Sequence, residues 1–156
     1  VDDHPAFLAG AAHLLKSGGK LIVSCGGEGN AAGIVRAMDE VIHKKEWIDY
    51  FSGFNFPYYF YSTRNYETWL PGAGFTSTRL ELVEKDMRHP GREGLAGWVR
   101  TRWVPDIQQF PGRIRDQFVF ECVDTCLALH PLDGTGQSHV RMIRLECEAR
   151  PVAPPE

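Results

Sequence analysis

The hydrophobic pattern in the first quarter of the chain predicts a helix followed by a buried strand. Asp2 or Asp3 is suited to cap the helix, and the pair Gly18-Gly19 ends it. The next segment, Lys20 to Cys25, contains the unbroken run Leu-Ile-Val, which predicts a strand covered on both faces, as in a parallel sheet. The apolar stripe that marks the helix consists of Phe7, Leu8, Ala11, Leu14 and Leu15.

A glycine-rich turn and an aromatic segment separate this strand from the next helices. Asn30 predicts the cap of a helix from about Ala31 to Lys45. The segment from Trp47 to Tyr61 is dominated by aromatic side chains around a proline, which predicts the surface of a lid rather than a regular element. Ser62 or Thr63 then caps a short helix that ends at the following glycines.

The second half of the chain alternates between strand and helix patterns. From Ser77 to Val83 apolar and charged residues alternate, which predicts a strand with one wet face. Helices are expected over 94–104 and 114–129, and a second alternating strand over 139–150. The proline-rich end, 151–156, predicts a disordered tail.

Composition narrows the possible function classes. The chain has 156 residues, 43% of them hydrophobic and 24% charged, as expected of one α/β domain over residues 1–150. Its 17 basic and 20 acidic residues leave a net charge of −3, so no broad positive field favours nucleic acid. No apolar run is long enough to cross a membrane, and four cysteines are too few for a disulfide scaffold. We therefore expect a cytoplasmic protein that binds neither nucleic acid nor membrane.

The order of the elements predicts a piece of a larger fold. A helix precedes the first strand, whereas a free-standing α/β domain normally begins with a strand, and the chain starts at Val1 rather than at methionine. Two turns resemble those of class I S-adenosylmethionine-dependent methyltransferases. Leu15-Lys16-Ser17-Gly18-Gly19 is similar to the L-K-P-G-G turn before their fifth strand, and Ala73-Gly74-Phe75 is similar to the A-G-F before their sixth.

Nearly the whole chain resembles the C-terminal half of the trans-aconitate methyltransferase-like branch of this family. The strings that carry the narrower resemblance are Val1-Asp2-Asp3-His4, Gly94-Leu95-Ala96-Gly97-Trp98-Val99-Arg100-Thr101, His130-Pro131-Leu132-Asp133 and Arg144-Leu145-Glu146. The resemblance implies the α/β fold of strands five to seven of a Rossmann-like sheet. It also implies a helical cap, with elements over about 47–72 and 88–130.

In that fold S-adenosylmethionine binds at the ends of strands one, two and four, and none of these strands has a counterpart in this sequence. The chain would then supply only the acceptor's side of the site, and we expect it to be inactive alone. The family's fifth strand, here Leu21 to Ser24, pairs with strand four on one side and strand seven on the other. Without strand four, we expect self-association or pairing with the missing N-terminal half through this strand.

A methyltransferase acting on a small-molecule acceptor is thus the leading interpretation, with a carboxylate oxygen as the expected acceptor group. Tyr59 and Tyr61 precede a helix and can direct their hydroxyls into a cleft. Arg64 or Arg102 can form the bidentate hydrogen bonds that suit a carboxylate. With Trp98, these are the candidate substrate-binding residues. Packing beneath a lid stays open for the aromatic residues, and surface ion pairs stay open for the arginines.

Two other motifs carry less weight. Gly27-Glu28-Gly29 with Gly33 lies between a strand and a helix, as a dinucleotide-binding turn would, but the third glycine comes one residue too late. Cys122 and Cys126 share a helix face with His130 one turn further on, but their apolar neighbours favour core packing over a metal. We assign no catalytic, metal-binding or cofactor-binding residue within the chain. A non-enzymatic α/β binding or interaction domain is the alternative function.

Overall fold

The computed structural model describes residues 2–16, 18–102 and 110–152. Its contacts divide the chain into two compact units, each built from segments that are far apart in the sequence. The sheet unit comprises Val1–Asn30, Phe56–Lys85 and Met142–Glu156, and the helical unit comprises Ala31–Asn55 and Asp86–Arg141. Two of the crossings between the units fall inside long β-strands.

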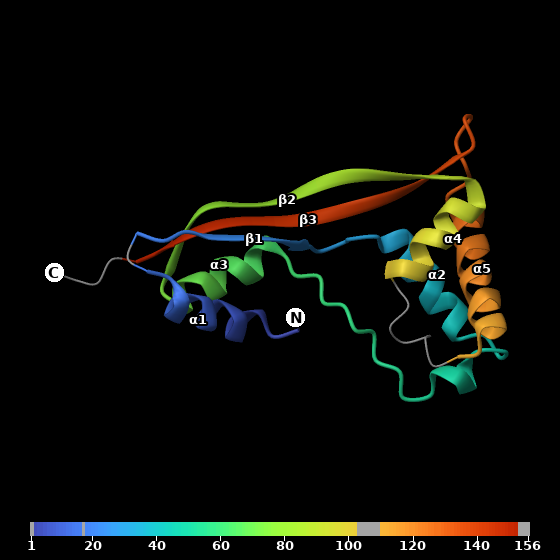
Figure 1. The fold of residues 1–156 in the computed structure, drawn as a ribbon, viewed down its shortest axis with the longest axis horizontal. Coiled ribbons are helices and arrows are strands. Elements are labelled where there is room, and N and C mark those ends of the chain that lie inside the picture. Colours follow the sequence, from blue (N-terminus) through green and yellow to red (C-terminus); the bar gives the residue numbers. More distant parts are fainter. Residues whose placement is uncertain (1, 17, 103–109, 153–156) are drawn as a thin grey trace. The chain divides into compact units, whose positions relative to one another are not determined.

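The sheet unit is an α/β arrangement in which helices cover one face of a three-stranded antiparallel sheet (Figure 1). β1 pairs with β3 from Leu21 opposite Ala149 to Gly26 opposite Arg144, and β2 lies on the other side of β3. The last strand of the chain is therefore the middle strand of the sheet. The elements are α1 (His4–Leu14), β1 (Leu21–Gly26), α3 (Thr63–Gly72), β2 (Phe75–Pro90) and β3 (Gln137–Pro151).

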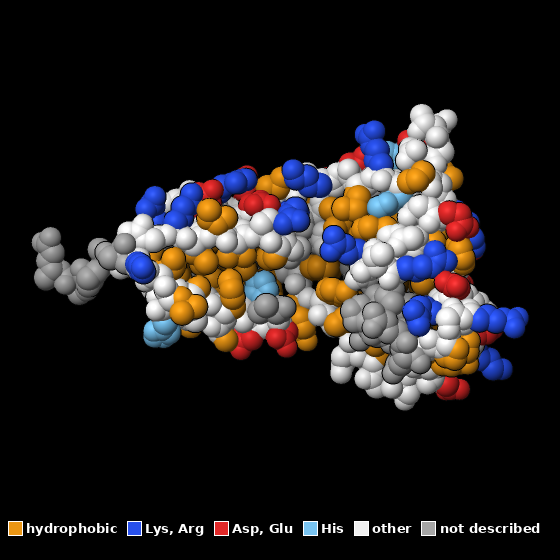
Figure 2. All heavy atoms as spheres, in the orientation of Figure 1, with side chains coloured by type: hydrophobic (Ala, Val, Ile, Leu, Met, Phe, Trp, Pro, Cys, Tyr) orange, Lys and Arg blue, Asp and Glu red, His pale blue; other side chains and the backbone are white. Residues whose placement is uncertain are grey.

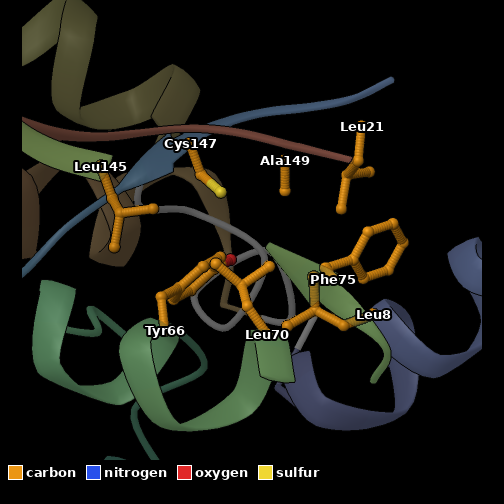
Figure 3. Close-up of a cluster of buried hydrophobic side chains, with 8 residues drawn as sticks. All are labelled: Leu8, Leu21, Tyr66, Leu70, Phe75, Leu145, Cys147 and Ala149. Carbon is orange, nitrogen blue, oxygen red and sulfur yellow. The ribbon is translucent and has the colours of Figure 1, made fainter. Parts of the chain in front are cut away.

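The inner face of the sheet packs against α1 and α3 to form the core of this unit (Figure 3). Side chains of β3 point toward Tyr66 and Leu70 of α3, and Leu8 of α1 packs in the same cluster. The alternation predicted for the last strand is confirmed, because its alternate apolar residues are buried. These are Ile143, Leu145, Cys147 and Ala149.

The outer face of the sheet is polar, so the expectation that the first strand is covered on both faces is wrong. Ile22 of β1 is 64% exposed. Beside it, Lys20 Nζ lies 2.5 Å from Glu148 Oε2, and Ser24 Oγ donates a hydrogen bond to Glu146 Oε1 at 2.7 Å. Three consecutive apolar residues predicted burial, but β1 is an edge strand of an antiparallel sheet, in which one face commonly stays in water.

Both helices of the sheet unit begin at the caps that the sequence predicts. Asp3 Oδ1 accepts a hydrogen bond from Ala6 N at 2.8 Å. In α3, Ser62 Oγ accepts from Asn65 N at 3.3 Å while Asn65 Oδ1 accepts from Ser62 N at 3.0 Å, which makes a reciprocal capping box. The end of α1 differs from the prediction, because Leu14 is 86% exposed and does not belong to the inner stripe.

Among its described residues, the helical unit consists of three helices, a 3-10 turn and the adjoining ends of β2 and β3. Its longest helix packs against both of the others. Cys122 and Cys126 are buried in that helix, which confirms their interpretation as core residues, and burial raises the pKa of both thiols. The elements are α2 (Ala32–Ile42), η1 (Ile48–Phe51), α4 (Gly91–Arg102) and α5 (Gly112–Leu129).

The prediction that Asn30 caps α2 is wrong. Ala31 holds the N-cap position, in a left-handed backbone conformation with φ of 52°. Asn30 Oδ1 instead accepts a hydrogen bond from Ile143 N at 2.9 Å, so this buried side chain ties the turn after β1 to β3. The partner lies 113 positions away in the sequence, and a local pattern carries no sign of it.

A carboxylate joins the turn between α2 and η1 to α5. Glu121 accepts hydrogen bonds from Lys44 Nζ at 2.6 Å and from Trp47 Nε1 at 2.7 Å. Burial alone would raise the pKa of Glu121, but the bonds from Lys44 and Trp47 outweigh it and hold the pKa below its usual range. Trp47 itself is buried against Phe118, with ring centres 5.0 Å apart.

His139, at the start of β3, lies between two carboxylates. Its Nδ1 is 3.0 Å from both carboxylate oxygens of Asp86, and its Nε2 is 2.9 Å from Asp133 Oδ2. The bonds to Asp133 and Asp86 raise the pKa of His139. In return the pKa of Asp133 is lowered, chiefly by His139, and the pKa of Asp86 is lowered by Arg88 and then His139. At neutral pH this arrangement favours the imidazolium form.

We expect this group to stabilise the protein only over a limited pH range. Because the pKa of His139 is raised, its contribution is complete below the unfolded value of 6.5 and is lost as pH rises through the folded value. Because both carboxyl pKa values are lowered, their contribution is present above the unfolded value of 3.8 and is lost as pH falls through the folded values. The melting temperatures of the protein and His139→Gln should differ most between about pH 4 and 6.5. A difference that does not change with pH would contradict this.

Candidate functional site

The sheet unit contains a pocket of about 290 Å³ at the carboxyl end of β1. The beginning of α1, the end of β1 and the segment that precedes α3 meet there. On the face seen in Figure 2, hydrophobic side chains gather over this unit next to a rim of charged ones. The lining consists of His4 and Phe7 from α1, Val23, Cys25 and Gly26 from β1, the segment Pro57 to Phe60, and Tyr66 from α3.

The polar groups of the pocket form one connected set. His4 Nδ1 and Tyr66 Oη are hydrogen-bonded at 2.6 Å, and the Tyr66 hydroxyl also bonds to the thiol of Cys25. Burial raises the pKa of Cys25, although its bond to Tyr66 has the opposite effect. The pKa of Tyr66 is raised by burial and, to a smaller extent, by the neighbouring Cys25. Both groups are therefore neutral at pH 7, and this end of the pocket is polar without a fixed charge from either.

The aromatic wall of the pocket is an extended segment whose side chains alternate. Tyr58 and Phe60 lie on one side with ring centres 6.3 Å apart and planes within 8°, and Tyr59 and Tyr61 form a similar pair at 6.3 Å and 16°. Two contacts hold the segment in place. Tyr61 Oη donates to Asp2 O at 2.7 Å, and the Tyr61 ring meets the edge of His4 at a distance of 4.7 Å between centres.

The glycine turn after β1 is fixed by its own backbone hydrogen bonds. Gly27 N donates to Ile143 O at 2.9 Å, Glu28 N donates to Tyr61 O at 3.0 Å, and Asn30 N donates to Gly27 O at 3.0 Å. In a dinucleotide-binding turn the amides point at the ligand's phosphates instead. This turn therefore uses these amides to connect β1 with β3 and with the aromatic segment.

Gly26 is needed for the close approach of the aromatic segment to β1. A Cβ at this position would lie 2.7 Å from Cε1 and 2.9 Å from Cδ1 of Phe60, and 2.9 Å from Asn30 Nδ2. No side chain larger than a hydrogen atom fits there without a shift of the ring. Gly26 thus allows Phe60 to form the wall of the pocket.

Of the two candidate tyrosines, Tyr59 lines this pocket, and Tyr61 lies beside it without being among the described lining residues. Tyr59 is 48% exposed, and Tyr61 stacks on Tyr59. Arg64 lies exposed on α3 and is not among the described residues that line the pocket.

The other two candidates, Trp98 and Arg102, belong to α4 of the helical unit. Trp98 lies beside His89, with ring centres 5.3 Å apart, and Arg102 is exposed in the last turn. On the same helix, Arg100 Nε donates to Asp116 Oδ1 at 2.9 Å, which matches the ion-pair interpretation of the arginines.

The sequence did not single out His4, Cys25, Tyr58, Phe60 or Tyr66 for this site. The sequence contains a weak signal for Cys25, because in a strand it points to the same face of the sheet as Leu21 and Val23. For His4 no signal was available. Its role depends on a contact with Tyr66, which lies 62 positions away.

A scan against protein-family models and a search of curated proteins each found no match to this chain. Within the part of the chain that the structure describes, no helix has the length and apolar character needed to span a bilayer.

Proposed function

We propose that this chain is the acceptor-binding part of an S-adenosylmethionine-dependent methyltransferase that acts on a small molecule. The observation that carries the proposal is the pocket between the start of α1, the end of β1 and the aromatic segment. Methyl transfer depends on holding an acceptor in line and away from water, and a pocket walled in part by aromatic rings supports both requirements. Because all four cysteines are free thiols, we also propose a reducing compartment, the cytoplasm, for the protein.

The pairing of β1 supports the same proposal. The resemblance implies that the strand at Leu21 to Ser24 pairs with the last strand of the chain, and β1 does pair with β3. The two turns that carry the resemblance each connect a helix to the strand that follows it, as the resemblance implies. One joins α1 to β1, and the other joins α3 to β2.

The described lining of this pocket does not offer the groups that recognition of S-adenosylmethionine calls for. Recognition of its ribose hydroxyls calls for a carboxylate, and no described residue lining the pocket is Asp or Glu. The amides of Gly27, Glu28 and Asn30 already donate to carbonyl groups of the protein. Under the proposal, the groups that hold the cofactor come from outside this chain.

The first expected result is therefore that the chain alone does not bind S-adenosylmethionine in titration calorimetry. Under the proposal, a parent protein in which a cofactor-binding half precedes Val1 should bind it and transfer a radiolabelled methyl group to a small molecule. Micromolar binding by the chain alone would contradict the assignment of the cofactor site. A gene without a strand followed by a D/E-x-G-x-G-x-G turn upstream of Val1 would contradict the methyltransferase proposal and favour a binding domain.

The free edge of β1 is the surface through which we propose pairing with the missing half or with a second copy. In the sheet formed by the described residues, β1 has a strand neighbour on one side only. Backbone N–H and C=O groups that are exposed along a strand edge, beside apolar side chains, favour the addition of another strand. Light scattering of the chain alone should show an oligomer, and the amides from Leu21 to Gly26 that do not bond to β3 should also exchange slowly. A monomer at high concentration with rapidly exchanging amides would contradict the pairing.

A further inference from the structure

The chemical character of the pocket restricts the ligands that it can hold. None of the described residues that line it is Lys, Arg, Asp or Glu. Transfer of an isolated carboxylate or phosphate into such surroundings removes its hydration, and a fixed cation is needed to compensate for that loss. A neutral ligand avoids this free-energy cost.

The size and shape of the pocket favour a flat ligand. An engineered cavity of about 150 Å³ lined by aliphatic and aromatic side chains binds benzene. The present pocket, at about 290 Å³, has room for one aromatic ring or two fused rings. Tyr58 and Phe60, whose ring planes are nearly parallel, both line the pocket, and aromatic rings pack well against a planar apolar surface.

One end of the pocket offers hydrogen-bonding groups. The Tyr66 hydroxyl bonds to His4 Nδ1 and to the Cys25 thiol, and a phenol oxygen has lone pairs in addition to its single proton. Because Tyr66 is fully buried and His4 nearly so, the half-buried Cys25 thiol is the member of this group that a ligand hydroxyl can approach, and its sulfur is a weak acceptor. Elsewhere in the lining, Phe7, Val23 and Phe60 contribute apolar surface.

We infer that the pocket binds a neutral aromatic compound of one or two fused rings that carries a hydroxyl group, and that this class supplies the methyl acceptor. The existence of the binding site is inferred from the geometry of the pocket. Its identification as the acceptor site rests on the proposed function. A phenol-type acceptor differs from the carboxylate that the arginines suggested, since no arginine is among the described lining residues.

The first test compares two probes of the same shape on the full chain. 2-Naphthol should bind, by calorimetry and saturation-transfer NMR, at least tenfold more tightly than 2-naphthoate at pH 7.5. Amide shifts caused by 2-naphthol should centre on β1 and on Tyr58 to Phe60. Equal or tighter binding of 2-naphthoate, or no binding of 2-naphthol at millimolar concentration, would overturn the inference.

The second test uses neighbouring residues of β1 that face opposite sides of the sheet. Val23→Phe places a ring in the pocket and should weaken 2-naphthol binding at least tenfold, whereas Ile22→Phe, on the exposed face, should leave it unchanged. Circular dichroism checks that both variants are folded. If Val23→Phe does not fold, the comparison of the two probes on the unsubstituted chain still decides the question. Unchanged binding in folded Val23→Phe would overturn the site.

Methylation by the parent protein separates the two proposals. Methyl transfer to naphthols or phenols supports both. Transfer only to carboxylic acids would overturn the acceptor class and leave the methyltransferase intact. A parent that binds naphthol and transfers no methyl group would contradict the proposed function, and with it the acceptor role, but not the binding site.

Discussion

Gly26→Ala is expected to remove ligand binding at the pocket while the chain stays folded. The new methyl group would lie 2.7 Å from Cε1 of Phe60, a distance that real Cβ contacts do not reach, so the ring must move. Because Phe60 forms part of the wall, its displacement changes the shape of the cavity that a flat ligand needs. We expect 2-naphthol binding to weaken at least tenfold and the free energy of unfolding to fall by about 1–3 kcal/mol.

Gly10→Ala is the matched control, since the same chemical change there meets no atom within 4 Å. Gly10 lies inside α1, so alanine should stabilise the protein by about 0.5–1 kcal/mol and leave ligand binding unchanged. Calorimetry with 2-naphthol and urea unfolding of both variants provide the measurements. If Gly26→Ala binds as tightly as the unsubstituted chain, Phe60 does not form the wall in solution.

Glu121→Ala should cause a large loss of stability in the helical unit. Its carboxylate accepts the hydrogen bond of Trp47 Nε1, and Trp47 is only 2% exposed. Without that acceptor a buried N–H group has no partner, and the ion pair with Lys44 is lost as well. We expect the free energy of unfolding to fall by about 2–3 kcal/mol, measured by urea denaturation.

Glu121→Gln separates the two contributions. The amide oxygen can still accept from Trp47 while the charge that attracts Lys44 is removed, so the loss should be about 1 kcal/mol. Equal losses for both variants would show that the charge, rather than the indole hydrogen bond, stabilises this contact. An additional Lys44→Met variant should then reproduce the full loss.

Local signals in the sequence are sufficient to predict where α1 and α3 begin and to predict β3, whose apolar and polar residues alternate regularly. Asp3 and Ser62 act through partners three residues away, and the buried residues of β3 recur with a period of two. The failures involve partners that are distant in sequence. Ile22 is exposed because β1 lies at the edge of an antiparallel sheet, and the letters of β1 alone do not contain that information.

The candidate site was predicted in part for the same reason. The aromatic segment was identified as a lid or as a pocket wall, and Tyr59 does line the pocket. His4 and Cys25 were not identified, because each acquires its place only when Tyr66 of α3 packs against both. Arginines were favoured for the chemistry of their side chains, whereas the position of Arg64 on an exposed helix surface depends on the tertiary fold.

The middle position of β3 has a consequence for the order of events during synthesis. Leu21 pairs with Ala149 in the register of β1 and β3, so β1 cannot pair until the end of the chain has been synthesised. β2 also leaves the ribosome before β3, the strand beside it, has been made. Until then the apolar face of β1 has no sheet to join, and non-local pairings of this kind make folding slow. A nascent chain arrested just after α5 should therefore depend on a chaperone to stay unaggregated, and release should follow within seconds of the emergence of β3.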